Sequence, residues 1–160
     1  MPSLARFRTA QDQSVAGFDQ ALAELRAGEK RGHWIWYVFP QLSGLGGSSM
    51  SRAYGIDGRA EAAAYLRDPV LRDRLLTIAE GAANHLRSGV SIERLMGSSI
   101  DAMKLVSSLT LFGRIARELE REGLEACGAL ASIADEILAA AESQGYPPCQ
   151  RTIAHLQRRA

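Results

Sequence analysis

The sequence predicts an all-α fold: one compact domain of several helices over residues 1–160, in which residues 34–39 are the one segment that could be extended. Three observations support this prediction. Apolar residues recur every three to four positions along most of the chain, the spacing of one face of an α-helix. Glycines and capping residues interrupt that pattern where helices would end or begin, and strands and helices do not alternate. The length suits a single domain whose core needs no disulfide or metal.

The first half of the chain begins with two expected helices. Residues 4–10 form the first, with Ser3 available as its N-cap. The second ends at Gly28 and is marked by apolar residues at helical spacing: Val15, Phe18, Leu22 and Leu25. Residues 44–51, GLGGSSMS, are expected to form a loop, because glycine and serine favour neither helix nor strand.

The second half of the chain is expected to be helical almost throughout. Asp68 followed by Pro69 predicts the start of a long helix that ends near Gly89, after an alanine-rich helix over residues 59–67. Ser91 can cap a short turn. Long helices are predicted over residues 100–122 and 124–143, the latter bent near Gly128, and a short helix follows the connector at residues 146–148.

Composition narrows the possible functions. Nineteen basic and eighteen acidic side chains give a net charge of +1, without the clustered basic excess typical of a nucleic-acid-binding protein. No His or Cys spacing predicts a metal site, and no cofactor is expected. The chain shows no secretory signal and no apolar run long enough to cross a membrane, so we expect a cytoplasmic protein without membrane contact.

Residues 34–39, WIWYVF, contain four of the ten aromatic residues. Whether this segment is a strand or a helix, apolar side chains cover every side of it, so it should pass through the middle of the protein. One interpretation is a plug of the core. The other is a wall on which a planar ligand stacks, formed by Trp34 or Trp36, with Lys30, Arg31 and His33 supplying positive charge at its edge.

Residues 44–51 combine three glycines with three serines, and Arg52 follows them. Such a segment can direct several backbone N–H groups at one anion, and Gly44, Gly46 and Ser49 are candidate contacts. It matches neither GxxxxGK[ST] nor GxGxxG, however, which favours an ordinary flexible loop.

A polar stripe begins the helix predicted over residues 100–122. Asp101, Lys104, Ser107 and Ser108 share one face by their spacing, while the neighbouring faces are mostly apolar. Three interpretations remain open. Asp101 and Lys104 could form a local ion pair, the serines could bond to carbonyls of the preceding turn, or the stripe could line a pocket for an anion.

Several runs together resemble a known family. They are KRGHWIWYVFPQLSGLG, then Ser49, Tyr54 and Ile56, then EAAAYLRDPVLRDRL and DAMKLVSSLTLF. In this order they resemble the chiefly bacterial family called domain of unknown function 1810, and the resemblance extends from Leu4 to the last helix. It implies a single all-helical domain and no established activity. The label calpastatin-like, often attached to such proteins, does not suit a chain with a patterned core, since calpastatin-type inhibitors are disordered.

The resemblance also implies a set of motif positions, which here are His33, Trp34, Trp36, Phe39, Pro40, Gln41, Gly44, Gly46, Lys104, Ser107, Ser108, Thr110 and Phe112. This mixture of Trp, His, Gln, Lys and Ser exceeds what packing requires and favours a pocket. The C-terminal GYPPCQRT departs from the family pattern, which leads us to expect an acidic residue after a glycine turn.

The leading hypothesis is a pocket for a small anionic ligand such as a nucleotide or sugar phosphate. In it, Trp34 or Trp36 stacks on the ring and Gln41 contacts the ring edge. Lys30, Lys104, Ser107, Ser108 and the glycine segment bind the anion. If a hydrolytic reaction occurs there, His33 and Asp101 are the candidate acids or bases. The alternative is a non-enzymatic protein-interaction module with a groove between helices, and the sequence does not predict the oligomeric state.

Overall fold

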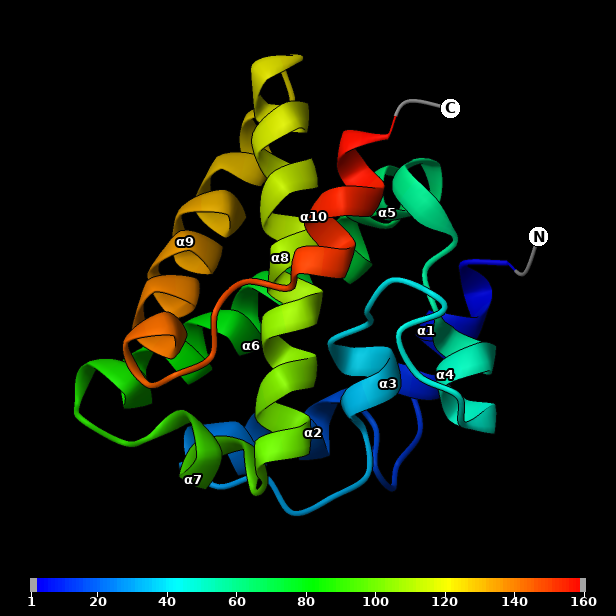
Figure 1. The fold of residues 1–160 in the computed structure, drawn as a ribbon. Coiled ribbons are helices and arrows are strands. Elements are labelled where there is room, and N and C mark those ends of the chain that lie inside the picture. The colour runs from blue at the N-terminus through cyan, green and yellow to red at the C-terminus, as the bar shows by residue number, and fades with distance from the viewer. Residues whose placement is uncertain (1–2, 159–160) are drawn as a thin grey trace.

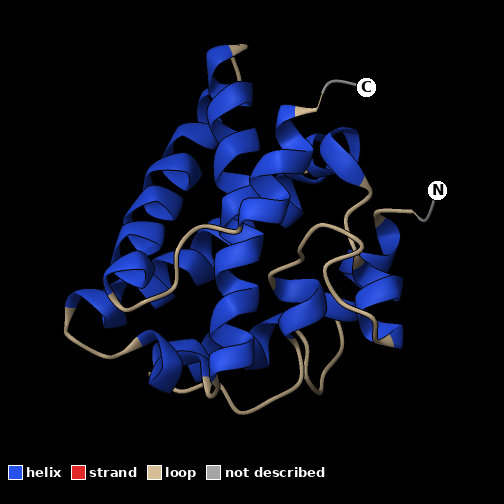
Figure 2. Cartoon of the chain, viewed as in Figure 1, coloured by secondary structure: helices blue, strands red, loops and turns tan. Residues whose placement is uncertain are grey.

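The structure is a computed structural model that describes residues 3–158, and within that range it contains ten α-helices, one 3-10 turn and no strand. The all-α prediction is confirmed. The extended alternative for residues 34–39 is wrong, because Ile35–Val38 form a single helical turn, α3. Extended pairing in residues 3–158 is limited to one parallel bridge between Leu42 and Ile56. Figure 2 shows helices throughout, joined by loops.

The first five helices follow the sequence pattern with two exceptions. They are α1 (Ala5–Gln11), α2 (Phe18–Arg26), α3, α4 (Ser49–Tyr54) and α5 (Gly58–Arg67). Val15 was expected on the apolar face of the second helix. It lies outside α2 instead, with 73% of its surface exposed. The loop expected over residues 44–51 is wrong for its last three residues, because α4 begins at Ser49. The Ser48 hydroxyl accepts a hydrogen bond from the backbone N–H of Ser51 and so caps a helix there.

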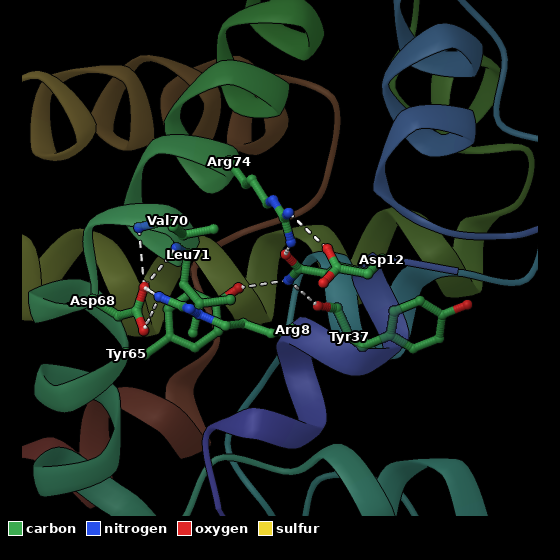
Figure 3. A network of polar contacts seen from close by, with 9 residues as sticks. Arg8, Asp12, Tyr37, Tyr65, Asp68, Val70, Leu71 and Arg74 are labelled. Atoms are coloured by element: carbon green, nitrogen blue, oxygen red, sulfur yellow. Dashed lines mark hydrogen bonds and ion pairs between the residues drawn. The ribbon is translucent and has the colours of Figure 1, made fainter. Parts of the chain in front are cut away.

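The remaining elements lie close to where the sequence predicts them. They are α6 (Pro69–Arg87), α7 (Ile92–Met96), α8 (Ser99–Arg121), the 3-10 turn η1 (Glu125–Cys127), α9 (Gly128–Ser143) and α10 (Gln150–Gln157). Asp68 caps α6 as expected: one of its carboxylate oxygens accepts from the N–H groups of Val70 and Leu71, and the carboxylate also pairs with Arg8 of α1 (Figure 3).

Helix α8 is the central element of the fold. Along it α9 packs on one side, α5 and α10 contact it on another, and α3 and α7 contact it as well (Figure 1). The apolar face expected beside its polar stripe is buried, and it consists of Leu105, Leu109, Phe112, Ala116 and Leu119. The beginning of α8 lies near α3, so the polar stripe and the aromatic segment come together.

Candidate functional site

A small hollow lies between α3, α4 and the beginning of α8. Its lining comes from all three helices and the segments beside them: Ile35, Trp36, Phe39, Gln41, Met50, Ser51, Tyr54, Gly55 and Lys104. Its volume is about 10 Å³, room for roughly one water molecule. In this conformation the site is therefore closed to anything larger.

Helix α3 brings Trp36 to the hollow because every other side of the helix is taken up by the core. Trp34, Ile35, Val38 and Phe39 are all buried, and only Trp36 in this segment is partly exposed. The peptide after Phe39 leads into a proline, which lacks the N–H that a longer helix would need. The core interpretation therefore holds for these four residues. Trp36 is the side chain left at an edge, and for it the stacking interpretation stays a prediction.

A buried polar network fixes the position of α3. The buried Gln11 side chain donates to the carbonyl of Tyr37 at 2.8 Å and to the Tyr65 hydroxyl at 3.1 Å. Arg74 donates to the Gln11 side-chain oxygen and pairs with Asp12 (Figure 3). The side-chain amide of Gln11, a residue of α1, therefore links the backbone of α3 to Tyr65 of α5 and Arg74 of α6.

Trp36 and Lys104 face one another at the hollow. The Lys104 ammonium lies 4.7 Å from the centroid of the Trp36 ring, a cation–π distance. The indole N–H of Trp36 is buried and has no hydrogen-bond acceptor among residues 3–158. Buried donors are nearly always paired, so this N–H needs a specific explanation.

Asp101 joins two lysines. One carboxylate oxygen lies 2.7 Å from the ammonium of Lys30 and the other lies 3.7 Å from that of Lys104. Lys30 is only 7% exposed; it also donates to the carbonyl of Gly32 at 2.5 Å and lies 5.0 Å from the ring centroid of Trp34. Asp101 therefore restrains Lys104 beside Trp36 and neutralises a buried cation.

Glu24 of α2 holds the segment that leads into α3. One carboxylate oxygen accepts from the backbone N–H groups of Arg31 and Gly32 and from the Trp34 indole, and the other accepts from Gln20. Burial acts to raise the pKa of Glu24, but the four hydrogen bonds outweigh it and lower that pKa to about 2. Trp34 is thereby fixed in the core.

Helix α4 covers the hollow. Its residues Met50, Ser51 and Tyr54 line the space, yet none of its side chains is fully buried. Arg6 holds its C-terminal end by donating to the carbonyls of Ala53 and Gly55, both at 3.0 Å. At the other end lies the glycine segment, where a Cβ on Gly46 would come within 2.5 Å of the Ser51 hydroxyl.

The structure brings some of the predicted site residues together and separates others. Trp36, Gln41 and Lys104 line the hollow, with Asp101 and Lys30 behind Lys104. Trp34 is fully buried and engaged by Glu24, which leaves Trp36 as the tryptophan at the edge. Gly46 lies beside Ser51 of the lining.

Nine of the twelve predicted residues do not line the hollow. Besides Lys30, Trp34, Gly46 and Asp101, which were placed above, they are His33, Gly44, Ser49, Ser107 and Ser108. Of these five, the first three are exposed. Ser107 is half-buried and lowers the pKa of the Cys149 thiol, although burial acts to raise it. Ser108 is fully buried with no partner for its hydroxyl among residues 3–158. Of the three interpretations of the polar stripe, the Asp101–Lys104 ion pair forms, and Lys104 also reaches the hollow.

Sequence reasoning missed the contribution of α4 to the site. Met50 and Tyr54 are four residues apart, and Ser48 precedes them as a cap, which together are a weak signal of one amphipathic helical turn. The three glycines nearby favour a loop, and this stronger signal led to the loop prediction.

Neither a cluster of metal ligands nor a membrane-spanning helix occurs in residues 3–158. No three His, Cys, Asp or Glu side chains there are grouped as metal ligands would be. None of the helices in that range combines the length and apolarity needed to cross a bilayer.

Comparison with known proteins identifies the family. The crystal structure of the conserved hypothetical protein Rv1873 from Mycobacterium tuberculosis is similar to this chain, with a TM-score of 0.80 and 36% identical residues. The match covers 98% of this chain and 97% of the other. No curated protein matches the chain significantly. The family profile described as "Protein of unknown function (DUF1810)" matches residues 1–126, most of the sequence, and the chain therefore belongs to this family.

Proposed function

We propose that the protein binds a small ligand with a planar body and a negative charge, such as a nucleotide or a sugar phosphate, at the hollow between α3, α4 and α8. The observation that carries the proposal is the Trp36 indole N–H, a buried donor without an acceptor at the edge of a hollow that also holds a cation and an amide. Such a set of groups suits a ligand that accepts a hydrogen bond and carries charge.

Each group at the hollow has a distinct role in this proposal. The Trp36 ring stacks on the planar part of the ligand, and its N–H, which lies in the plane of the ring, donates to an acceptor on the part of the ligand at the ring edge. Gln41 supplies an amide that can both donate and accept. Lys104 attracts the anion, and Asp101 keeps the Lys104 ammonium close to the ring.

Entry of the ligand requires α4 to move, because the closed hollow has only about 10 Å³. The helix is suited to this movement, since it is six residues long and buries no side chain completely. The glycine segment before it offers flexible backbone, with Gly44 already at a φ of +88°. The Arg6 contacts would keep its C-terminal end in place.

The geometry favours binding over hydrolysis. Asp101 already contacts two ammonium groups, which occupy the oxygens that a general base would use. His33 is exposed and does not line the hollow.

A thermal-shift screen tests the proposal, with nucleotides, ADP-ribose, sugar phosphates and nucleobases as the compounds. A ligand at a hundred times its Kd adds about 2.7 kcal/mol to stability. For a domain of this size that raises the Tm by roughly 5–11 °C. Trp36→Phe keeps an aromatic ring but removes the N–H, so it should weaken binding of the hit about tenfold or more.

Matched variants decide whether a hit occupies this site. Lys104→Met should also weaken binding, whereas Arg94→Met removes an exposed cation on α7 and should not. A hit that all three variants bind equally well would place the ligand elsewhere. A cooperative melt with no shift for any compound would count against a small-molecule ligand.

One observation favours the alternative, a protein-interaction module. Ile100 and Met103, three residues apart at the beginning of α8, are 64% and 60% exposed. Exposed apolar pairs of this kind occur at protein contacts. If they mediate self-association, sedimentation should detect an oligomer that the double substitution Ile100→Ser, Met103→Ser converts to monomer. A wild-type protein that sediments as a monomer at high concentration would remove this candidate.

A further inference from the structure

A second concave surface lies far along α8 from the first hollow and shares no lining residue with it. It is a groove of about 420 Å³ between the C-terminal half of α8, the beginning of α5 and the end of α10. The residues that line it are Arg59, Arg114, Arg117, Glu118, Arg121, Leu156 and Gln157. Figure 1 shows α10 and α5 beside this part of α8.

The groove concentrates positive charge. Four arginines and one glutamate line it, so the lining carries a net charge of +3 (four minus one), whereas the whole chain carries +1. Three of the arginines are on one helix at positions i, i+3 and i+7, which places them on one face. Like charges at this spacing repel one another by a few tenths of a kcal/mol unless a carboxylate lies between them.

Two of the arginines are fixed by the fold. Arg117 donates to Glu120 at 3.0 Å and to Asp135 of α9 at 2.9 Å. Arg59 pairs with Glu118 and also donates to the carbonyl of Leu156, which ties α5 to both α8 and α10. These guanidinium groups therefore border the groove in set positions.

The other two arginines are not engaged. Arg114 and Arg121 are exposed, and neither forms a hydrogen bond or ion pair within residues 3–158. Arg121 lies in the last turn of α8, where any cation is favoured by the helix dipole. Arg114 is two turns earlier, too far from the end of the helix for the dipole to favour a cation there. At 1.5 Å per residue, the two positions are about 10 Å apart along the helix.

From these contacts we infer that the groove binds a chain of linked phosphates. Guanidinium groups bind phosphate oxygens through two parallel hydrogen bonds, and a row of them suits an anion whose charge is spread along its length. Arg114 and Arg121 bind the two ends of the phosphate chain, and Arg117 and Arg59 flank its middle. The terminal phosphates of a nucleotide and an inorganic oligophosphate offer the same chemistry.

The lining distinguishes such a ligand from a nucleic-acid strand. Proteins that bind single strands combine basic residues with aromatic rings on which the bases stack. None of the residues that line the groove is aromatic. The groove thus provides contacts for phosphates and none for stacked bases.

Isothermal titration calorimetry at low ionic strength tests the inference, with tripolyphosphate, pyrophosphate and phosphate as titrants. Affinity should rise in the order phosphate, pyrophosphate, tripolyphosphate. The double variant Arg114→Gln, Arg121→Gln should bind tripolyphosphate at least tenfold more weakly. Both side chains are exposed and unpaired, so this variant should melt like the wild type.

A charge-matched control separates the groove from general attraction. Arg26→Gln, Arg94→Gln also removes two exposed positive charges, on α2 and α7, and should change the Kd less than threefold. Equal weakening in the two double variants would overturn the inference, as would the absence of tripolyphosphate binding. Binding of a single-stranded oligonucleotide more tightly than tripolyphosphate would overturn it in favour of a nucleic acid.

Two further titrations complete the test. Trp36→Phe should leave tripolyphosphate binding unchanged. If this variant no longer bound tripolyphosphate, the phosphates would be assigned to the first hollow and the inference would be overturned. ATP that binds as tightly as tripolyphosphate would support an inorganic ligand, and ATP that binds more tightly would support a nucleotide whose phosphates occupy the groove.

Discussion

The ammonium of Lys104 lies 4.7 Å from the centroid of the Trp36 ring, and this pair joins α8 to α3 at the edge of the hollow. Asp101 contacts the same ammonium from one turn earlier on α8. The Lys104 side chain is 22% exposed, so water screens it only partly. The pair therefore contributes to the position of Trp36 even without a ligand.

We predict measurable coupling between these two residues. In a double-mutant cycle with Lys104→Met and Trp36→Leu, the coupling free energy of unfolding should be about 0.5–1 kcal/mol, the usual strength of a partly exposed cation–π pair. Urea denaturation of the four proteins measures it. A parallel cycle with Arg94→Met in place of Lys104→Met should show no coupling, and a Lys104–Trp36 value indistinguishable from that control would refute the assignment.

The Lys30–Asp101 pair should matter more to stability than the contact with Lys104. Asp101→Asn leaves Lys30, which is 7% exposed, without its counter-charge and should cost about 2–3 kcal/mol, somewhat less than breaking a fully buried pair. The double variant Lys30→Met, Asp101→Asn should be more stable than the sum of the two single losses predicts. Additive losses in urea denaturation would mean that the two groups do not stabilise one another.

The fold was largely predictable because helix signals are local. The cap formed by Asp68 and the Gly28 stop each depend on a few neighbouring residues, and both occur where the sequence indicates. The failures also have local causes. The three glycines before α4 favour a loop, so its helical turn was not predicted. Val15 has the spacing of a residue on the buried face of α2, but it is exposed and lies outside the helix.

The site was predictable only in part, because its contacts join distant residues. The sequence placed Asp101 and Lys104 on one face of a helix, but the partner of Asp101 at 2.7 Å is Lys30, seventy-one positions earlier. The three arginines of α8 share one helical face by their spacing, which the sequence does show, but Arg59 lies fifty-five positions before the first of them and joins them only in the fold. Only the packing of α3, α5 and α10 on α8 assembles these sets.

The Glu24 carboxylate should make stability depend on pH in the acid range. Its pKa is about 2 in the folded protein and about 4.5 in a model compound, so the ionised form is favoured by folding. The stabilisation is therefore fully present above about pH 4.5 and is lost as the pH falls towards 2. Glu24→Gln should be less stable than the wild type at pH 7, and that difference should shrink between pH 4.5 and 2. Urea denaturation at a series of pH values checks this, and a difference independent of pH would contradict it.

Two glycines with left-handed backbone allow a matched test of how Lys30 is held. Gly97 and Gly89 have φ values of +84° and +95°, each just after a helix, so alanine at either position should cost about 1 kcal/mol in backbone strain. A Cβ on Gly97 would also lie 2.9 Å from the carbonyl oxygen of Lys30, whereas one on Gly89 would have no atom within 4 Å.

Gly97→Ala should therefore be the more destabilising substitution, by about 1 kcal/mol or more beyond Gly89→Ala, because backbone atoms have to move to relieve the clash. This backbone movement should shift Lys30, because the N–H of Lys30 donates to the carbonyl of Leu95 at 2.8 Å, two residues before Gly97. In the Gly97→Ala background, Asp101→Asn should then cost less than it does in the wild type, because the Lys30–Asp101 geometry is already disturbed. Equal stabilities of the two alanine variants in urea denaturation would contradict the prediction, because they would show that the segment at Lys30 moves away from the added methyl group without cost.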